Sequence, residues 1–203
     1  MKNPGTIKLF LFLVMGFIVF TPLGTLAHEL GHYAVARLLG YEARLSFGFT
    51  HLPENLSPRD SFLVSLGGPL QTMLTGSLGL FVMLREKRTA GEKRPLTSKQ
   101  WGIVFISLFW SRQLFNFAMD LAYYLRHGSF LIYNDESKLA VHLGLHPISI
   151  SLGSALIALG VCSLVYFRFI PSTQRRPFIA AGMAGGLSGY LLWFYLLGPW
   201  LLP

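Results

Sequence analysis

Residues 26–33 read Leu-Ala-His-Glu-Leu-Gly-His-Tyr, with two histidines four positions apart and a glutamate directly after the first. Positions four apart on an α-helix lie one above the other on the same face, so His28 and His32 can reach one metal ion. Glu29 stands beside the first histidine, where it could act as general base for a water molecule. Three ionisable groups in an apolar helix need a partner or a use. The spacing therefore predicts a zinc (Zn2+) site formed by His28 and His32, with Glu29 as the catalytic residue.

The composition around this stretch is typical of a membrane protein. Hydrophobic residues make up 52% of the 203 and charged residues only 13%, and the charges gather between long uncharged runs. Those runs cover residues 9–27, 61–84, 143–167 and 177–203. Each is close to the ~20 residues with which a helix crosses a bilayer. The sequence predicts an all-α polytopic membrane protein with five to six transmembrane helices, forming a single domain over residues 1–203.

The positive net charge has a different meaning in a membrane protein than in a soluble one. A net charge of +8 would suggest nucleic acid for a soluble chain. Here it indicates basic cytosolic loops facing an anionic lipid bilayer, so no nucleic-acid partner is expected. The loops at 85–99 and 168–176 hold most of these charges, and the positive-inside rule places them in the cytosol. We expect a multi-pass protein in the cell (cytoplasmic) membrane of a prokaryote.

Breaks in the apolar pattern flank the motif. Thr21-Pro22-Leu23-Gly24 interrupts the first run, so residues 7–39 form either one broken helix or a tight hairpin. Gly40 is expected to end the motif helix. In residues 41–52, apolar and polar or small residues alternate, which predicts a strand-like segment after the motif helix. An edge strand that includes Phe47 could pair with the backbone of an unfolded substrate. An interfacial loop with aromatic anchors is the alternative.

Two later spans carry polar or small residues at membrane depth. The run at 61–84 contains Gly67-Gly68-Pro69, where Gly68 and Pro69 serve either close helix packing or substrate binding. The span at 101–125 carries Arg112, Asn116 and Asp120, which lie four apart and so share one face. Asn116 could bridge the other two, as part of a polar stripe inside the bundle.

Residues 28–49 resemble the site-2 protease family of intramembrane zinc metalloproteases, in which a His-Glu-x-x-His helix is followed by a small-residue turn and a strand. Ser65-Leu66-Gly67-Gly68-Pro69 is similar to the family's second core helix, which carries a Gly-Pro pair. The resemblance implies His28 and His32 as zinc ligands, Glu29 as base, and hydrolysis of peptide bonds in membrane-embedded or membrane-adjacent substrates. It covers residues 28–140, within a core of about 7–145. The family's PDZ and CBS domains are absent, and the two C-terminal helices, about 148–201, carry no family motif.

The resemblance does not supply the third zinc ligand directly. The family's third core helix carries an asparagine and then Leu-Asp-Gly, and no Leu-Asp-Gly occurs in this sequence. Asp120 and Asp135 are the candidates, and Asn116 would match the family's asparagine. Asp135, followed by Leu139, fits the divergent members better, and the apolar segment 130–133 would let the chain re-enter the membrane. We therefore favour Asp135 as third ligand, with Asn116, Gly68, Pro69 and Phe47 as candidate substrate-binding residues.

Three classes of function fit these features. The first is a zinc-dependent endopeptidase whose partner is a membrane protein or peptide substrate. The second is a catalytically inactive membrane binding or assembly protein that retains the protease fold and metal site. The third is a transporter or metal carrier. A pair of matching broken helices, one in each half of the chain, would favour this class, and the sequence has no such pair. Glu29 favours the enzyme, because a structural zinc needs no base and prefers four protein ligands.

Overall fold

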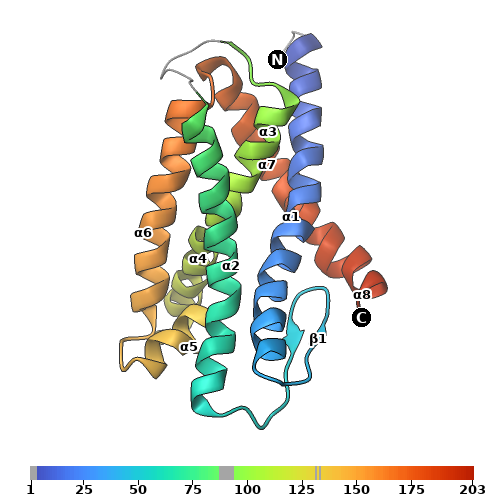
Figure 1. The fold of residues 1–203 in the computed structure, drawn as a ribbon. Helices are drawn as coiled ribbons and strands as arrows, with labels where there is room; N and C mark the ends of the chain where they lie inside the picture. Colours follow the sequence, from blue (N-terminus) through green and yellow to red (C-terminus); the bar gives the residue numbers. More distant parts are fainter. Residues whose placement is uncertain (1–3, 87–93, 131, 133) are drawn as a thin grey trace.

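The computed structural model describes residues 4–86, 94–130, 132 and 134–203, and shows a helical bundle with one short β-hairpin (Figure 1). Much of the basic loop predicted at 85–99, and two residues of the apolar segment 130–133, lie outside the described residues.

The motif helix, α1 (Pro4–Leu38), is continuous over 35 residues and has Pro22 inside it. The predicted alternative of a tight hairpin is therefore wrong. A proline removes one hydrogen bond from a helix, and nearby hydroxyls help to satisfy the carbonyls around it in apolar surroundings. The hydroxyl of Thr21 donates to the carbonyl of Phe17, and that of Thr25 donates to the carbonyl of Thr21. The helix thus continues to its C-terminal half, where the motif lies.

Gly40 ends α1 as predicted. It adopts a left-handed backbone conformation with φ of +87°, which costs little only for glycine. Its N–H donates to the carbonyl of Arg37, and the N–H of Tyr41 donates to the carbonyl of Ala36. These two bonds satisfy the last carbonyls of the helix in the Schellman arrangement.

The segment after α1 does form strand structure within residues 41–52, but as a hairpin of two short strands and not as one extended strand. Strand β1 (Arg44–Leu45) pairs antiparallel with β2 (Thr50–His51). The chain reverses between them, where the N–H of Ser46 donates to the carbonyl of Phe49. The apolar alternation runs through this reversal, so the pattern alone did not reveal the turn.

The described part of the middle of the chain forms four α-helices and one 3₁₀ turn. α2 (Pro58–Arg85) begins at the N-cap Ser57 and contains Pro69. α3 (Ser98–Ser107), the 3₁₀ turn η1 (Leu108–Trp110) and α4 (Ser111–His127) follow one another along the span predicted at 101–125. The short helix α5 (Asp135–His142) has Asn134 as its N-cap. α5 packs against α2 and α6.

The C-terminal part consists of two long helical segments. α6 (Ile148–Leu164) continues into the π-helical η2 (Val165–Phe169), and α7 (Ser172–Leu192) continues through η3 (Trp193–Leu197) into α8 (Gly198–Leu201). α7 packs on α1, where Gly185 and Gly189 lie against the α1 backbone (Figure 1). Small residues allow this close approach of two helices.

Three described segments are long and apolar enough to cross a membrane: Gly5–Leu38, Ile148–Phe169 and Ser172–Leu201. These features are those of a membrane protein, but the predicted five to six spans are not confirmed. Glycine, serine and threonine residues and Gln71 lower the mean hydropathy of α2. η1 separates α3 from α4, and α4 carries a charged and polar stripe.

Among the described residues, the buried ionisable side chains gather in one half of the bundle. The apolar core lies toward the N-terminal half of α1, with Leu13, Trp101, Phe105, Phe169 and Phe178 among its members. Toward the C-terminal half of α1, the buried side chains include polar and charged ones: His28, Glu29, His32, Thr72, Gln113 and Glu136. Burying polar groups is costly unless they are paired, so this second half is where a site is expected.

Candidate metal centre

Three electron-pair donors from two separate helices meet beside α2. Nε2 of His28 and Nε2 of His32 lie 3.1 Å apart on one face of α1. Oδ2 of Asp135, the first residue of α5, lies 3.0 Å from Nε2 of His28 and 3.1 Å from Nε2 of His32. His28 and His32 are buried, and the Asp135 side chain is 21% exposed. The structure thus brings together the three residues that the sequence marks as metal ligands.

A threonine on α2 sets the tautomer of His28. Oγ1 of Thr72 lies 3.0 Å from the Gly68 carbonyl, one turn earlier, and 3.0 Å from Nδ1 of His28. A carbonyl only accepts, so the hydroxyl proton goes to Gly68 and the hydroxyl oxygen accepts from Nδ1–H of His28. The Nε2 atom of His28 therefore presents a lone pair to Asp135 and His32.

The tautomer of His32 follows from its hydrogen bonds in the same way. Its Nδ1 lies 2.6 Å from the main-chain carbonyl of Val64 on α2, so Nδ1 carries the proton and donates it. The N–H of Gly68 also lies 3.3 Å from this Nδ1. The contact with the Val64 carbonyl is the shorter of the two and assigns the proton to Nδ1. A protonated Nδ1 cannot also accept from the Gly68 N–H. Nε2 of His32 is again left with its lone pair, as in histidines that bind metals.

The charge of Asp135 completes the donor set. Burial acts to raise its pKa, but a proton or cation shared with Nε2 of His28 and His32 favours the carboxylate and holds the pKa well below its usual range. Two imidazole lone pairs and a carboxylate repel one another unless a proton or a metal cation lies between them. Ligand atoms at about 2.0–2.1 Å from a tetrahedral zinc are ~3.3 Å from one another, close to the separations found here. Two histidines and one carboxylate match the donor set of catalytic zinc sites.

Glycines on α1 and α2 make room for this arrangement. A Cβ atom at Gly68 would overlap Nε2 of both His28 and His32. One turn away, a Cβ at Gly31 would overlap the carbonyl of Gly67, and a Cβ at Gly67 would meet the carbonyl of Gly31. The backbones of α1 and α2 are therefore in direct contact beside the imidazoles. Gly68 lines the space next to the two Nε2 atoms.

Glu29 is buried next to the ligands and is held from two sides. Its carboxylate lies within 4.8 Å of ligand nitrogens of His28 and His32. Oγ1 of Thr50, on β2, lies 3.1 Å from Oε2 of Glu29 and 2.9 Å from its main-chain carbonyl. On the other side, Nη2 of Arg112 lies 4.0 Å from Oε1. The carboxylate is thus oriented by the hairpin and by α4.

The polar stripe of α4 meets other elements, so the predicted bridge of Asn116 between Arg112 and Asp120 is wrong. Arg112 points to Glu29, as described above. Nδ2 of Asn116 donates to both carboxylate oxygens of Glu136. Asp120 accepts from Nδ2 of Asn134. Asp120 therefore lies outside the donor set, whereas Asp135 belongs to it.

Two other predicted site residues lie in packing contacts. Pro69 is buried inside α2, next to Gly68. Phe47 lies in the turn of the hairpin, where its N–H donates to the carbonyl of Leu202 and its carbonyl accepts from Nε1 of Trp193. The turn therefore rests on the C-terminal segment.

Several residues of the site carry no signal in the sequence. Thr50 contacts Glu29 only because the chain reverses between β1 and β2. The Val64 carbonyl belongs to the backbone, so no residue type marks it. Glu136 is fully buried: burial raises the pKa of its carboxyl, the Asp135 carboxylate acts in the same direction, and the bonds from Asn116 oppose them.

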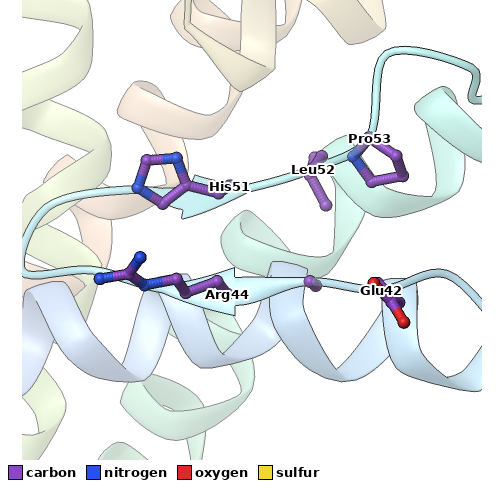
Figure 2. Close-up of a pocket in the computed structure, with 6 residues that line it drawn as sticks. Glu42, Arg44, His51, Leu52 and Pro53 are labelled. Atoms are coloured by element: carbon purple, nitrogen blue, oxygen red, sulfur yellow. The ribbon is translucent and has the colours of Figure 1, made fainter.

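A shallow hollow on the hairpin is separate from the metal centre. Figure 2 shows it between the two strands and the segment that follows β2. Its lining residues are Glu42, Ala43, Arg44, His51, Leu52 and Pro53. Neither the three donors nor Glu29 line it.

No protein-family model, no curated protein and no solved structure matches this chain. Its function is therefore inferred from the chemistry of the site itself.

Proposed function

We propose that this protein is a zinc-dependent endopeptidase that hydrolyses peptide bonds of membrane-embedded or membrane-adjacent substrates. The observation that carries this proposal is the set of three donors, Nε2 of His28, Nε2 of His32 and Oδ2 of Asp135, within 3.1 Å of one another. The hydrogen bonds of the two histidines leave both lone pairs facing this point. A buried glutamate stands beside them, which a purely structural metal site would not need.

A zinc ion held by His28, His32 and Asp135 would supply a Lewis acid for the peptide carbonyl and would lower the pKa of a water molecule. Glu29 is the general base: its carboxylate takes one proton from the attacking water as the water oxygen bonds to the carbonyl carbon. The same proton then passes to the amide nitrogen as the carbon–nitrogen bond breaks. Thr50 and Arg112 keep the Glu29 carboxylate in place during both transfers.

The proposal includes further membrane crossings by α2 and by the α3–η1–α4 run, beyond the three apolar segments. Figure 1 shows α2 alongside α1, and α4 packs on α6. Their polar groups face partners inside the bundle: Thr72 contacts His28, and Asn116 contacts Glu136. Polar residues of membrane helices are tolerated on such interior faces. Substrate contacts by Asn116, Gly68, Pro69 and Phe47 stay a prediction.

The experiment compares purified wild type with Glu29→Gln in detergent, measuring zinc per protein and cleavage of an unfolded membrane peptide. Glu29→Gln keeps the ligands but loses the base, so it should retain zinc and lose at least ~100-fold in rate. Glu54→Gln, an exposed glutamate, is the matched control and should behave as wild type.

Two results would contradict the proposal. Equal turnover by wild type and Glu29→Gln would remove Glu29 from the mechanism. Zinc binding by wild type with no turnover of any membrane peptide would favour the catalytically inactive binding or assembly protein.

A further inference from the structure

Two residues of α4 hold the neighbours of Asp135 on both sides. Asn116 and Asp120 lie four apart and so share one face of α4. Nδ2 of Asn116 lies 3.1 Å from Oε1 and 3.2 Å from Oε2 of Glu136, the residue after Asp135. Asp120 accepts a hydrogen bond from Asn134, the residue before it. Neither α4 residue contacts the metal donors directly.

The side chain of Asn134 makes two different contacts at once. Its Oδ1 accepts from the N–H of Ser137 at 2.7 Å, which caps the first turn of α5. Because a backbone N–H can only donate, the amide oxygen must face Ser137, and Nδ2 is left for the Asp120 carboxylate. The cap that begins α5 is therefore also tied to α4.

Asp135 needs such support because it begins a very short helix. α5 has eight residues, and isolated helices of that length are unstable in water. Successive residues of a helix point about 100° apart, so Glu136 can face α4 while Asp135 faces α1. Contacts on both sides of Asp135 fix the rotation of the first turn of α5 about its axis. They also fix where the Asp135 carboxylate lies relative to His28 and His32.

We propose that Asn116 and Asp120 are positioning residues that set the metal affinity of the site by holding Asp135 toward His28 and His32. The inference rests on the proposed metal site and assigns a role to the α4 stripe. A carboxylate that binds a metal depends on the groups that orient it, and loss of such groups typically costs about 10–100-fold in metal affinity.

The test measures zinc affinity of the full-length protein in detergent by competition with a chelator. Asp120→Leu and Asn116→Leu should each bind zinc about tenfold more weakly, or worse. Asp120→Asn keeps an acceptor for Asn134 and should stay near wild type. Gln113→Leu is the matched control, since Gln113 is a fully buried polar residue of α4 that contacts Ser154 on α6 instead of α5. It should leave zinc affinity unchanged.

A paired exchange separates positioning from general loss of structure. Asn134→Asp keeps the helix cap but sets two carboxylates against each other, so zinc affinity should fall. Adding Asp120→Asn restores a donor opposite the new carboxylate at position 134 and should bring the affinity back. The visible spectrum of the Co2+-loaded protein supplies a second readout, because loss of the carboxylate ligand changes the coordination geometry.

Zinc binding by wild type and His32→Ala tests the metal site itself, whereas zinc binding by the Leu variants tests the positioning role. If wild type binds no zinc, or binds it equally well as His32→Ala, the metal site itself fails. If wild type and His32→Ala differ as expected but the Leu variants at 116 and 120 bind zinc like wild type, the positioning role is wrong and the metal site stands.

Discussion

The hydroxyl of Thr72 accepts a hydrogen bond from Nδ1 of His28 across the contact between α2 and α1. Because the same hydroxyl gives its proton to the Gly68 carbonyl, the direction of the bond to His28 is fixed. The Nε2 lone pair of a buried histidine therefore depends on a single oxygen atom of another helix.

Thr72→Val should weaken zinc binding by about 10–100-fold, because the isosteric valine cannot accept from Nδ1–H and His28 loses its fixed tautomer. Thr72→Ser keeps the hydroxyl and should restore most of the affinity. Chelator competition measures both. Valine and serine variants with equal zinc affinity would show that the hydroxyl does not orient His28.

Gly68→Ala should abolish zinc binding, because a Cβ at this position overlaps Nε2 of both His28 and His32. On helix propensity alone, alanine at this position would stabilise α2 by about 1 kcal/mol. Loss of zinc would therefore reflect blocked space at the imidazoles and not a poorer helix former. Gly102→Ala on α3, where nothing lies within 4 Å, is the control and should keep its zinc. Full zinc in Gly68→Ala would mean that the two imidazoles lie elsewhere when the ion binds.

Thr50→Val should slow peptide cleavage without changing zinc content. The variant removes one hydrogen bond to Glu29, worth about 1 kcal/mol, which corresponds to about fivefold in rate. Thr50→Ser keeps the hydroxyl and should recover the rate. A parallel loss of zinc and activity in Thr50→Val would instead assign the hairpin a role in forming the metal site.

The basic end of the bundle should face the cytosol. Ser98 and Glu54 are both exposed and lie beyond opposite ends of α2. After Cys162→Ser, a membrane-impermeant maleimide applied to intact cells should label Glu54→Cys, and should label Ser98→Cys only after lysis. The reverse pattern would invert the orientation.

Several features of the structure could be predicted from residues that lie close together in the sequence. The four-residue spacing places His28 and His32 on one face whatever surrounds them, and the end of α1 at Gly40 follows from its backbone freedom. The N-cap of α5 is Asn134, a residue type that favours this position. Each of these features depends on residues within one or two helical turns of one another, which is why the sequence predicts them.

Features that depend on distant partners were harder to predict. The spacing of the α4 stripe is local, yet its partners are on α1 and α5, so the internal bridge by Asn116 was the wrong choice. The reversal between β1 and β2 is held partly by the carbonyl of Leu202, near the other end of the sequence. Burial in the bundle, and not local propensity, decides which of several possible partners a polar group takes.

The distance in sequence between the donors has a consequence for the stability of the whole chain. His32 and Asp135 are separated by 103 residues, and His28 and Asp135 by 107. An ion bound to all three would be a reversible crosslink that closes this long segment, which includes α2, α3 and α4. Closing a long loop removes more freedom from the unfolded chain than closing a short one. The reaction centre would then also act as the clamp that joins the first and fifth helices.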